Sequence, residues 1–194
     1  MKSVRRIVRL AGVVTLFAAG PALAHPGHGG HTFTTGLLHP LTGLDHVLAM
    51  TGVGLLAAKR GGKATLLWPC AFVAAMLAGY GLGVWRQAGP PAEPGVLASM
   101  IVLGALAASS IEVPLAAGLG LIMLFGACHG YAHGLEAPRA AGLGFPLGFA
   151  LSTAALHGLG LGLGALALRL RQPTALRLLG GGVALGGLML VLAG

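Results

Sequence analysis

Residues 64–85 read ATLLWPCAFVAAMLAGYGLGVW, an uncharged run that lies between Lys63 and Arg86. A helix of about 20 apolar residues spans the hydrocarbon core of a bilayer, so this stretch is typical of a transmembrane helix. Similar runs recur along the chain, and the predicted spans are 36–58, 64–85, 95–111, 113–133, 141–168 and 174–193. The sequence therefore predicts an all-α protein, a polytopic membrane bundle of six transmembrane helices.

The composition of the whole chain supports this assignment. Of 194 residues 56% are hydrophobic, and 12 basic and 4 acidic residues make only 8% charged. A soluble domain has about a quarter of its residues charged. The chain is therefore neither a soluble enzyme nor a disordered tail. Glycine occurs 35 times, in runs such as Gly158-x-Gly160-x-Gly162-x-Gly164, which we interpret as sites where membrane helices approach closely.

The N-terminus has the pattern of a secretory signal peptide. Lys2, Arg5, Arg6 and Arg9 precede an apolar run at 10–20 that ends in Ala22-Leu23-Ala24. A basic region, an apolar region and small residues predict a cleavable signal peptide over 1–24; the alternative is an uncleaved extra helix. A His/Gly-rich periplasmic segment over 25–35, with His25, His28 and His31, would then precede a six-helix domain over 36–194. Such a segment is typical of metal binding, and a solvated tether is the alternative.

The basic residues also predict an orientation. If the signal peptide is cleaved on the outer side, the first span of the mature chain runs from outside to inside. The inner loops then hold Lys59, Arg60, Lys63, Arg169, Arg171 and Arg177, and the outer loops hold Arg86 and Arg139. This agrees with the positive-inside rule and predicts that both termini lie on the outer side of the membrane. No basic face alternates with aromatic residues, so we expect no nucleic-acid partner.

Polar residues inside membrane spans are costly and are functional by default. The first cluster is His39-Pro40-Leu41-Thr42-Gly43-Leu44-Asp45-His46. His39 and His46 are seven residues apart and share a helix face, although Pro40 and Gly43 loosen that geometry. We expect His39 just before the helix, with Pro40 in its first turn. Asp45 is either a metal ligand or the partner that orients a histidine, and a structural cluster at a helix start is the alternative.

The second cluster lies in the fourth predicted span, at Cys128-His129-Gly130-Tyr131-Ala132-His133-Gly134-Leu135-Glu136. His129, His133 and Glu136 share a helix face. Two imidazoles and a carboxylate suit a divalent transition metal, and a helix cap is the alternative. In the predicted orientation both clusters lie on the outer side of the membrane, at similar depth.

Three further residues, one histidine and two cysteines, are candidates for chemistry inside the bundle. His157 lies halfway along the fifth span, where it is either a deeper metal ligand or a helix–helix hydrogen bond. Cys70 and Cys128 are predicted to lie too far apart for a disulfide.

At these motifs the sequence resembles the HupE/UreJ family of nickel permeases. The segment Gly148-Phe149 with Thr153 and Leu156-His157 is also similar to that family's fifth span. The resemblance implies secondary, non-ATP uptake of Ni2+ into the bacterial cytoplasm, and therefore a protein of the bacterial inner membrane with both termini periplasmic. It implies that transport depends on His39, Asp45, His46 and Glu136, with His129 and His133 beside them. Cys128 stands where the family pattern has an aromatic residue, so the metal preference and the role of this thiol stay open.

The predicted function is thus a permease, not an enzyme, whose metal site comprises His39, Asp45, His46, His129, His133, Glu136 and His157. Ni2+ is the transported substrate, no cofactor is bound permanently, and the partners are the metal ion and the lipid bilayer. The oligomeric state is open. A Co2+ permease of the same family is one alternative. A haem-binding membrane redox subunit is another, and an intramembrane hydrolase using Ser109 or Ser152 with His157 is a third.

Overall fold

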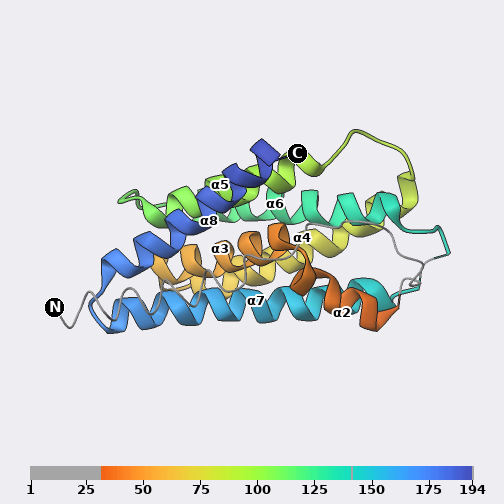
Figure 1. The fold of residues 1–194 in the computed structure, drawn as a ribbon. Coiled ribbons are helices and arrows are strands. Elements are labelled where there is room, and N and C mark those ends of the chain that lie inside the picture. Colours follow the sequence, from red (N-terminus) through yellow and green to blue (C-terminus); the bar gives the residue numbers. More distant parts are fainter. Residues whose placement is uncertain (1–31, 141, 194) are drawn as a thin grey trace.

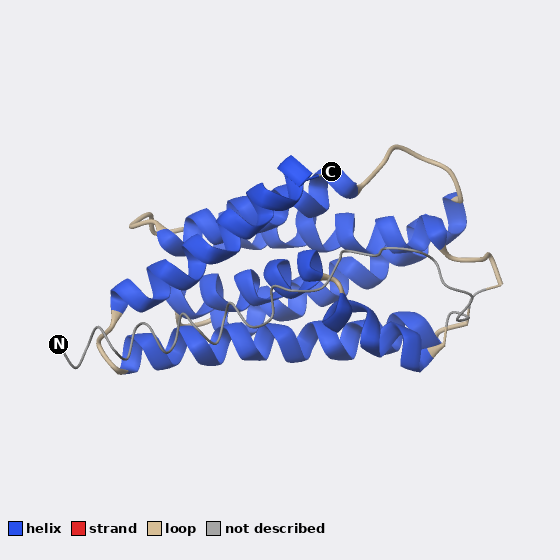
Figure 2. Ribbon diagram, in the orientation of Figure 1, coloured by secondary structure: helices blue, strands red, loops and turns tan. Residues whose placement is uncertain are grey.

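The computed structural model describes residues 32–140 and 142–193, which form seven helices and no strand (Figure 2). The helices run along the length of one elongated bundle (Figure 1). They are α2 (Phe33–Thr42), α3 (Leu44–Arg60), α4 (Ala64–Arg86), α5 (Glu93–Ala108), α6 (Leu115–Glu136), α7 (Gly144–Arg169) and α8 (Pro173–Ala193). The all-α prediction is confirmed, whereas the predicted signal peptide and the histidines of 25–31 lie outside the described residues.

Most of the predicted spans correspond to helices that can cross a membrane. By length and composition α4, α6, α7 and α8 can do so, and α2 and α3 qualify together as a pair bent by 81°. With 16 residues, α5 is about 24 Å long, less than the ~30 Å hydrocarbon core. It begins part-way along the bundle (Figure 1). The third predicted span, over 95–111, and with it a total of six crossings, therefore stays a prediction.

The first predicted span differs from the structure, because it is two helices and not one. Pro40 has no N–H to donate within α2, and Gly43 leaves the helix with φ −89° and ψ 116°. The Thr42 hydroxyl donates to the carbonyl oxygens of Leu38 and His39, at 3.3 and 3.0 Å. His39 lies inside α2, and not ahead of the helix as predicted. The break therefore places His39 and His46 on two separate helices.

The bundle is held by pairs of helices that are not consecutive in the chain. The most extensive contacts join α4 to α6, α3 to α7, α5 to α8 and α2 to α7. Glycine makes these contacts close: a Cβ at Gly130 of α6 would overlap the Met76 carbonyl of α4, and one at Gly160 of α7 would overlap the Thr51 carbonyl of α3. The packing role predicted for the α7 glycines holds for Gly160 and Gly164. It does not hold for Gly158 and Gly162, which face open space.

One end of the bundle carries most of the basic residues that the structure describes, and we call it the cationic end. It contains the turn from α3 to α4, the segment 109–114 and the turn from α7 to α8 (Figure 1). The Lys59 ammonium donates to the carbonyl oxygens of Leu106, Ser109 and Ile111, at 2.6, 2.7 and 3.0 Å, and so caps the end of α5. The opposite end, where α2 lies, is called the site end.

Candidate metal centre

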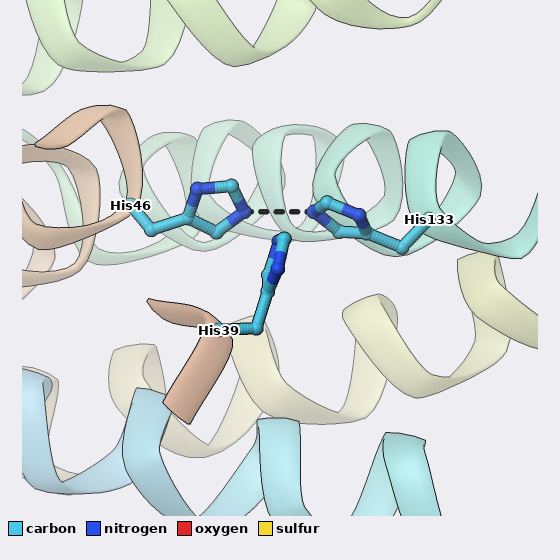
Figure 3. A group of neighbouring side chains, drawn as sticks. All are labelled: His39, His46 and His133. Carbon is cyan, nitrogen blue, oxygen red and sulfur yellow. Dashed lines mark hydrogen bonds between the residues drawn. The ribbon is translucent and has the colours of Figure 1, made fainter. Parts of the chain in front are cut away.

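Three imidazoles from three helices converge near the site end. They belong to His39 of α2, His46 of α3 and His133 of α6 (Figure 3). One ring nitrogen of each lies within 4.8 Å of the others. Within 32–140 and 142–193 no other group of three histidine, cysteine or acidic side chains meets that spacing. We call these residues the three-histidine group.

The closest contact in the group joins two nitrogen atoms. His46 Nε2 lies 2.7 Å from His133 Nε2, the dashed line in Figure 3. One of these nitrogens must carry a proton and the other must accept it. Metal–imidazole bonds are about 2.1 Å, so an ion bound to both would hold the nitrogens roughly 3 Å apart or more. The rings must therefore move to admit an ion between them, and a His133 ring that binds through Nε2 and stays neutral carries its proton on Nδ1.

A carboxylate oxygen lies near the Nδ1 atom of each of these two histidines. Asp45 Oδ1 lies 2.8 Å from His46 Nδ1. This contact favours a proton on Nδ1 and leaves the Nε2 lone pair directed at His133. Of the two roles predicted for Asp45, the geometry therefore supports that of an orienting partner. Glu136 Oε2 lies 3.7 Å from His133 Nδ1, and its side chain is 72% exposed, so its charge lies at the mouth of the site.

Aromatic rings from α7 line the group and exclude water. The Phe149 ring lies 5.0 Å from that of His133 and 5.7 Å from that of His46, and Phe145 lies 5.8 Å from His39. Apolar walls lower the local dielectric and so strengthen polar interactions inside. Sequence reasoning did not select Phe145. The sequence did offer a signal for it: Phe145 precedes Phe149 by four residues in the predicted fifth span, so both rings lie on the same face of one helix.

The remaining two predicted histidines lie deeper. His129 is fully buried; its ring lies 5.6 Å from that of His46, and its Nδ1–H donates to the Phe125 carbonyl at 2.8 Å. His157 is buried against the ring of Phe72, at 5.0 Å, and does not join the three-histidine group. The structure thus gathers Asp45, His129 and Glu136 around the group and leaves His157 apart.

The serines and cysteines singled out in the sequence contact neither the three-histidine group nor one another in any hydrogen bond among the described residues. The Ser152 hydroxyl donates to backbone carbonyls of its own helix, and the Ser109 hydroxyl donates to the Leu106 carbonyl. These contacts give the hydrolase alternative no support. Cys70 and Cys128 are both free thiols, as predicted.

Comparison with known proteins places this geometry in context. The family model described as HupE / UreJ protein matches residues 13–190. The chain belongs to the HupE/UreJ family. A HupE/UreJ relative, Protein HupE of Rhizobium leguminosarum bv. viciae, is 37% identical over 174 residues, which cover 88% of this chain and 91% of that protein. No solved structure matches the chain. The resemblance drawn from the two histidine motifs is thereby confirmed.

Proposed function

We propose that the chain is a secondary transporter that takes up a divalent transition-metal ion, with Ni2+ as its main substrate. The convergence of His39, His46 and His133 on one point carries the proposal. Neutral imidazoles suit Ni2+, Co2+, Cu2+ and Zn2+, so the choice among them rests on the geometry of the site. Membership of the HupE/UreJ family supports nickel.

In this proposal the site end faces the periplasm and the cationic end faces the cytoplasm. The signal peptide is removed, α5 and the α2–α3 pair count among six spans, and both termini are periplasmic. The gathering of basic residues at one end supports this orientation. Asp45 and Glu136 offset the charge of the captured ion. A membrane potential, negative inside, would favour inward movement of two charges by about 5 kcal/mol per 100 mV.

The haem alternative finds less support in the site. Two of the imidazoles contact each other at 2.7 Å, and the ring of His39 lies 4.4 Å from that of His133. Such rings leave no space for a porphyrin between them. A Co2+ permease would use the same donors, so competition between metals must decide that alternative.

The direct test is uptake of labelled Ni2+ by proteoliposomes that contain the full chain, under an inside-negative potential. Co2+ and Zn2+ serve as competitors, and empty liposomes serve as the blank. We expect saturable uptake, with stronger competition from Co2+ than from Zn2+. Uptake no faster than that of empty liposomes would refute the transport function, and stronger affinity for Co2+ than for Ni2+ would change the substrate.

Asp45→Asn is expected to weaken Ni2+ binding about 10- to 100-fold, the usual cost of losing a partner that orients a metal-binding histidine. The amide keeps the size of the side chain but removes the charge beside His46 Nδ1. Titration calorimetry of purified protein measures the effect. Glu112→Gln, which changes a carboxylate near the cationic end, is the matched control. Equal affinity in the two variants would contradict the orienting role.

A further inference from the structure

His157 is a buried histidine that the three-histidine group does not use. Its side chain is 1% exposed, and neither ring nitrogen has a hydrogen-bond partner within the described residues. Buried polar atoms almost always have a partner, because an unpaired one costs free energy. The helix–helix hydrogen bond considered for His157 from the sequence is not present there. Its environment therefore calls for a partner outside the described residues.

The position of His157 relates it to the candidate metal centre. It follows Phe149 by eight residues on α7, which places it about 12 Å further along the helix toward the cationic end. Phe72 of α4 contacts both deeper histidines: its ring is 5.4 Å from that of His129 and 5.0 Å from that of His157. His129 also has an unpartnered nitrogen, Nε2, within the described residues.

Other donor atoms line the interior near His157. Thr153 lies one turn from His157 on the same helix and is fully buried, and its hydroxyl lies 3.7 Å from the Met76 sulfur of α4. The interior around Phe72, Thr153 and His157 thus contains nitrogen, oxygen and sulfur atoms. An apolar core of the same shape would need none of them.

We propose that His157 is a second, inner binding station for the transported divalent transition-metal ion, which the ion reaches past His129. This inference rests on the proposed transport function. Conduction needs sites that bind well enough to admit an ion and weakly enough to release it. One or two imidazoles bind an ion more weakly than three, so a station at His157 favours release toward the cationic end. Phe72 separates the two stations.

The first test compares His157→Ala with Ser152→Ala, which removes a buried hydroxyl of the same helix. Equilibrium Ni2+ binding in detergent reports the three-histidine group, and initial uptake by proteoliposomes reports passage. We expect His157→Ala to keep the binding affinity within about twofold while uptake falls at least ~10-fold, because an interior step is lost. Ser152→Ala is expected to change neither quantity by more than about twofold.

A second variant, His157→Cys, distinguishes a ligand from a packing residue. A thiolate is a softer ligand than imidazole, so uptake is expected to recover in part and to be blocked by Cd2+ at about tenfold lower concentration than in the wild type. A residue with only a structural role would not alter the response to Cd2+.

The outcomes separate the two proposals. If the wild type transports Ni2+ and both His157 variants match it in rate and in Cd2+ response, the inner station is refuted and the transport function stands. Loss of Ni2+ binding at the three-histidine group in both variants would assign His157 to folding and also refute the station. Absence of uptake by the wild type would refute the transport function itself.

Discussion

Replacing His133 with alanine is expected to abolish high-affinity Ni2+ binding and the uptake that depends on it. The change removes one of three converging ligands and leaves His46 Nε2 without its 2.7 Å contact. Loss of an orienting partner alone costs about 10- to 100-fold in affinity, so loss of a ligand is expected to cost at least ~100-fold. Titration calorimetry and proteoliposome uptake measure the two effects.

The matched control for this prediction is Met123→Ala, on the same helix. Met123 is also a potential metal ligand, but its side chain is 46% exposed and lies away from the site. Binding and uptake by this variant are expected to equal those of the wild type. If His133→Ala binds Ni2+ as tightly as Met123→Ala does, the three-histidine group is not the capture site.

Gly130→Leu is expected to prevent α4 and α6 from packing. Any Cβ at this position overlaps the carbonyl oxygen of Met76, and a backbone group cannot rotate away as a side chain can. Overpacking in a dense interior lowers the free energy of unfolding by about 1–3 kcal/mol or more. We expect the upper end of this range, because the atoms that a Cβ would meet belong to the backbone of Met76 and Tyr80. Thermal unfolding in detergent, together with the yield of monodisperse protein, measures the loss.

Gly120→Leu is the control for the packing prediction. Gly120 lies on the same helix, and no heavy atom of a described neighbour lies within 4 Å of a Cβ placed there. The substitution is expected to change the free energy of unfolding by no more than about 0.5 kcal/mol. Equal tolerance of leucine at both positions would show that the close backbone contact does not hold α4 to α6.

The helices of this protein were largely predictable because their signal is local. The run 64–85 was predicted as a span and is α4, Ala64–Arg86; the run 174–193 is α8, Pro173–Ala193. The length of the apolar run and the charged residues that flank it determine where such a helix begins and ends. The 81° bend between α2 and α3 was not predicted, because it does not depend on a local signal alone. Proline and glycine mark a weak point in a helix, but the contacts of α2 with α7 decide how far the chain turns there.

The candidate site was predictable in its residue types and not in their pairing. Two histidine motifs and an orientation from loop charges predicted that both clusters lie at similar depth, and the structure brings His39, His46 and His133 together near one end of the bundle. Side-chain rotamers decide that Asp45 lies against its neighbour His46, although adjacent residues of a helix point about 100° apart. Tertiary packing decides that Phe145 and Phe149 form the walls, and that His157 stands apart.

The order of helix contacts bears on how the protein is made. His46 and His133 are separated by 87 positions, and the main partners of α2, α3 and α4 are α7, α7 and α6. During synthesis the first helices therefore enter the bilayer before their partners exist. A growing chain holds only His39 and His46 of the three-histidine group until α6 has been made, so the group cannot assemble on a ribosome-bound intermediate that ends before α6.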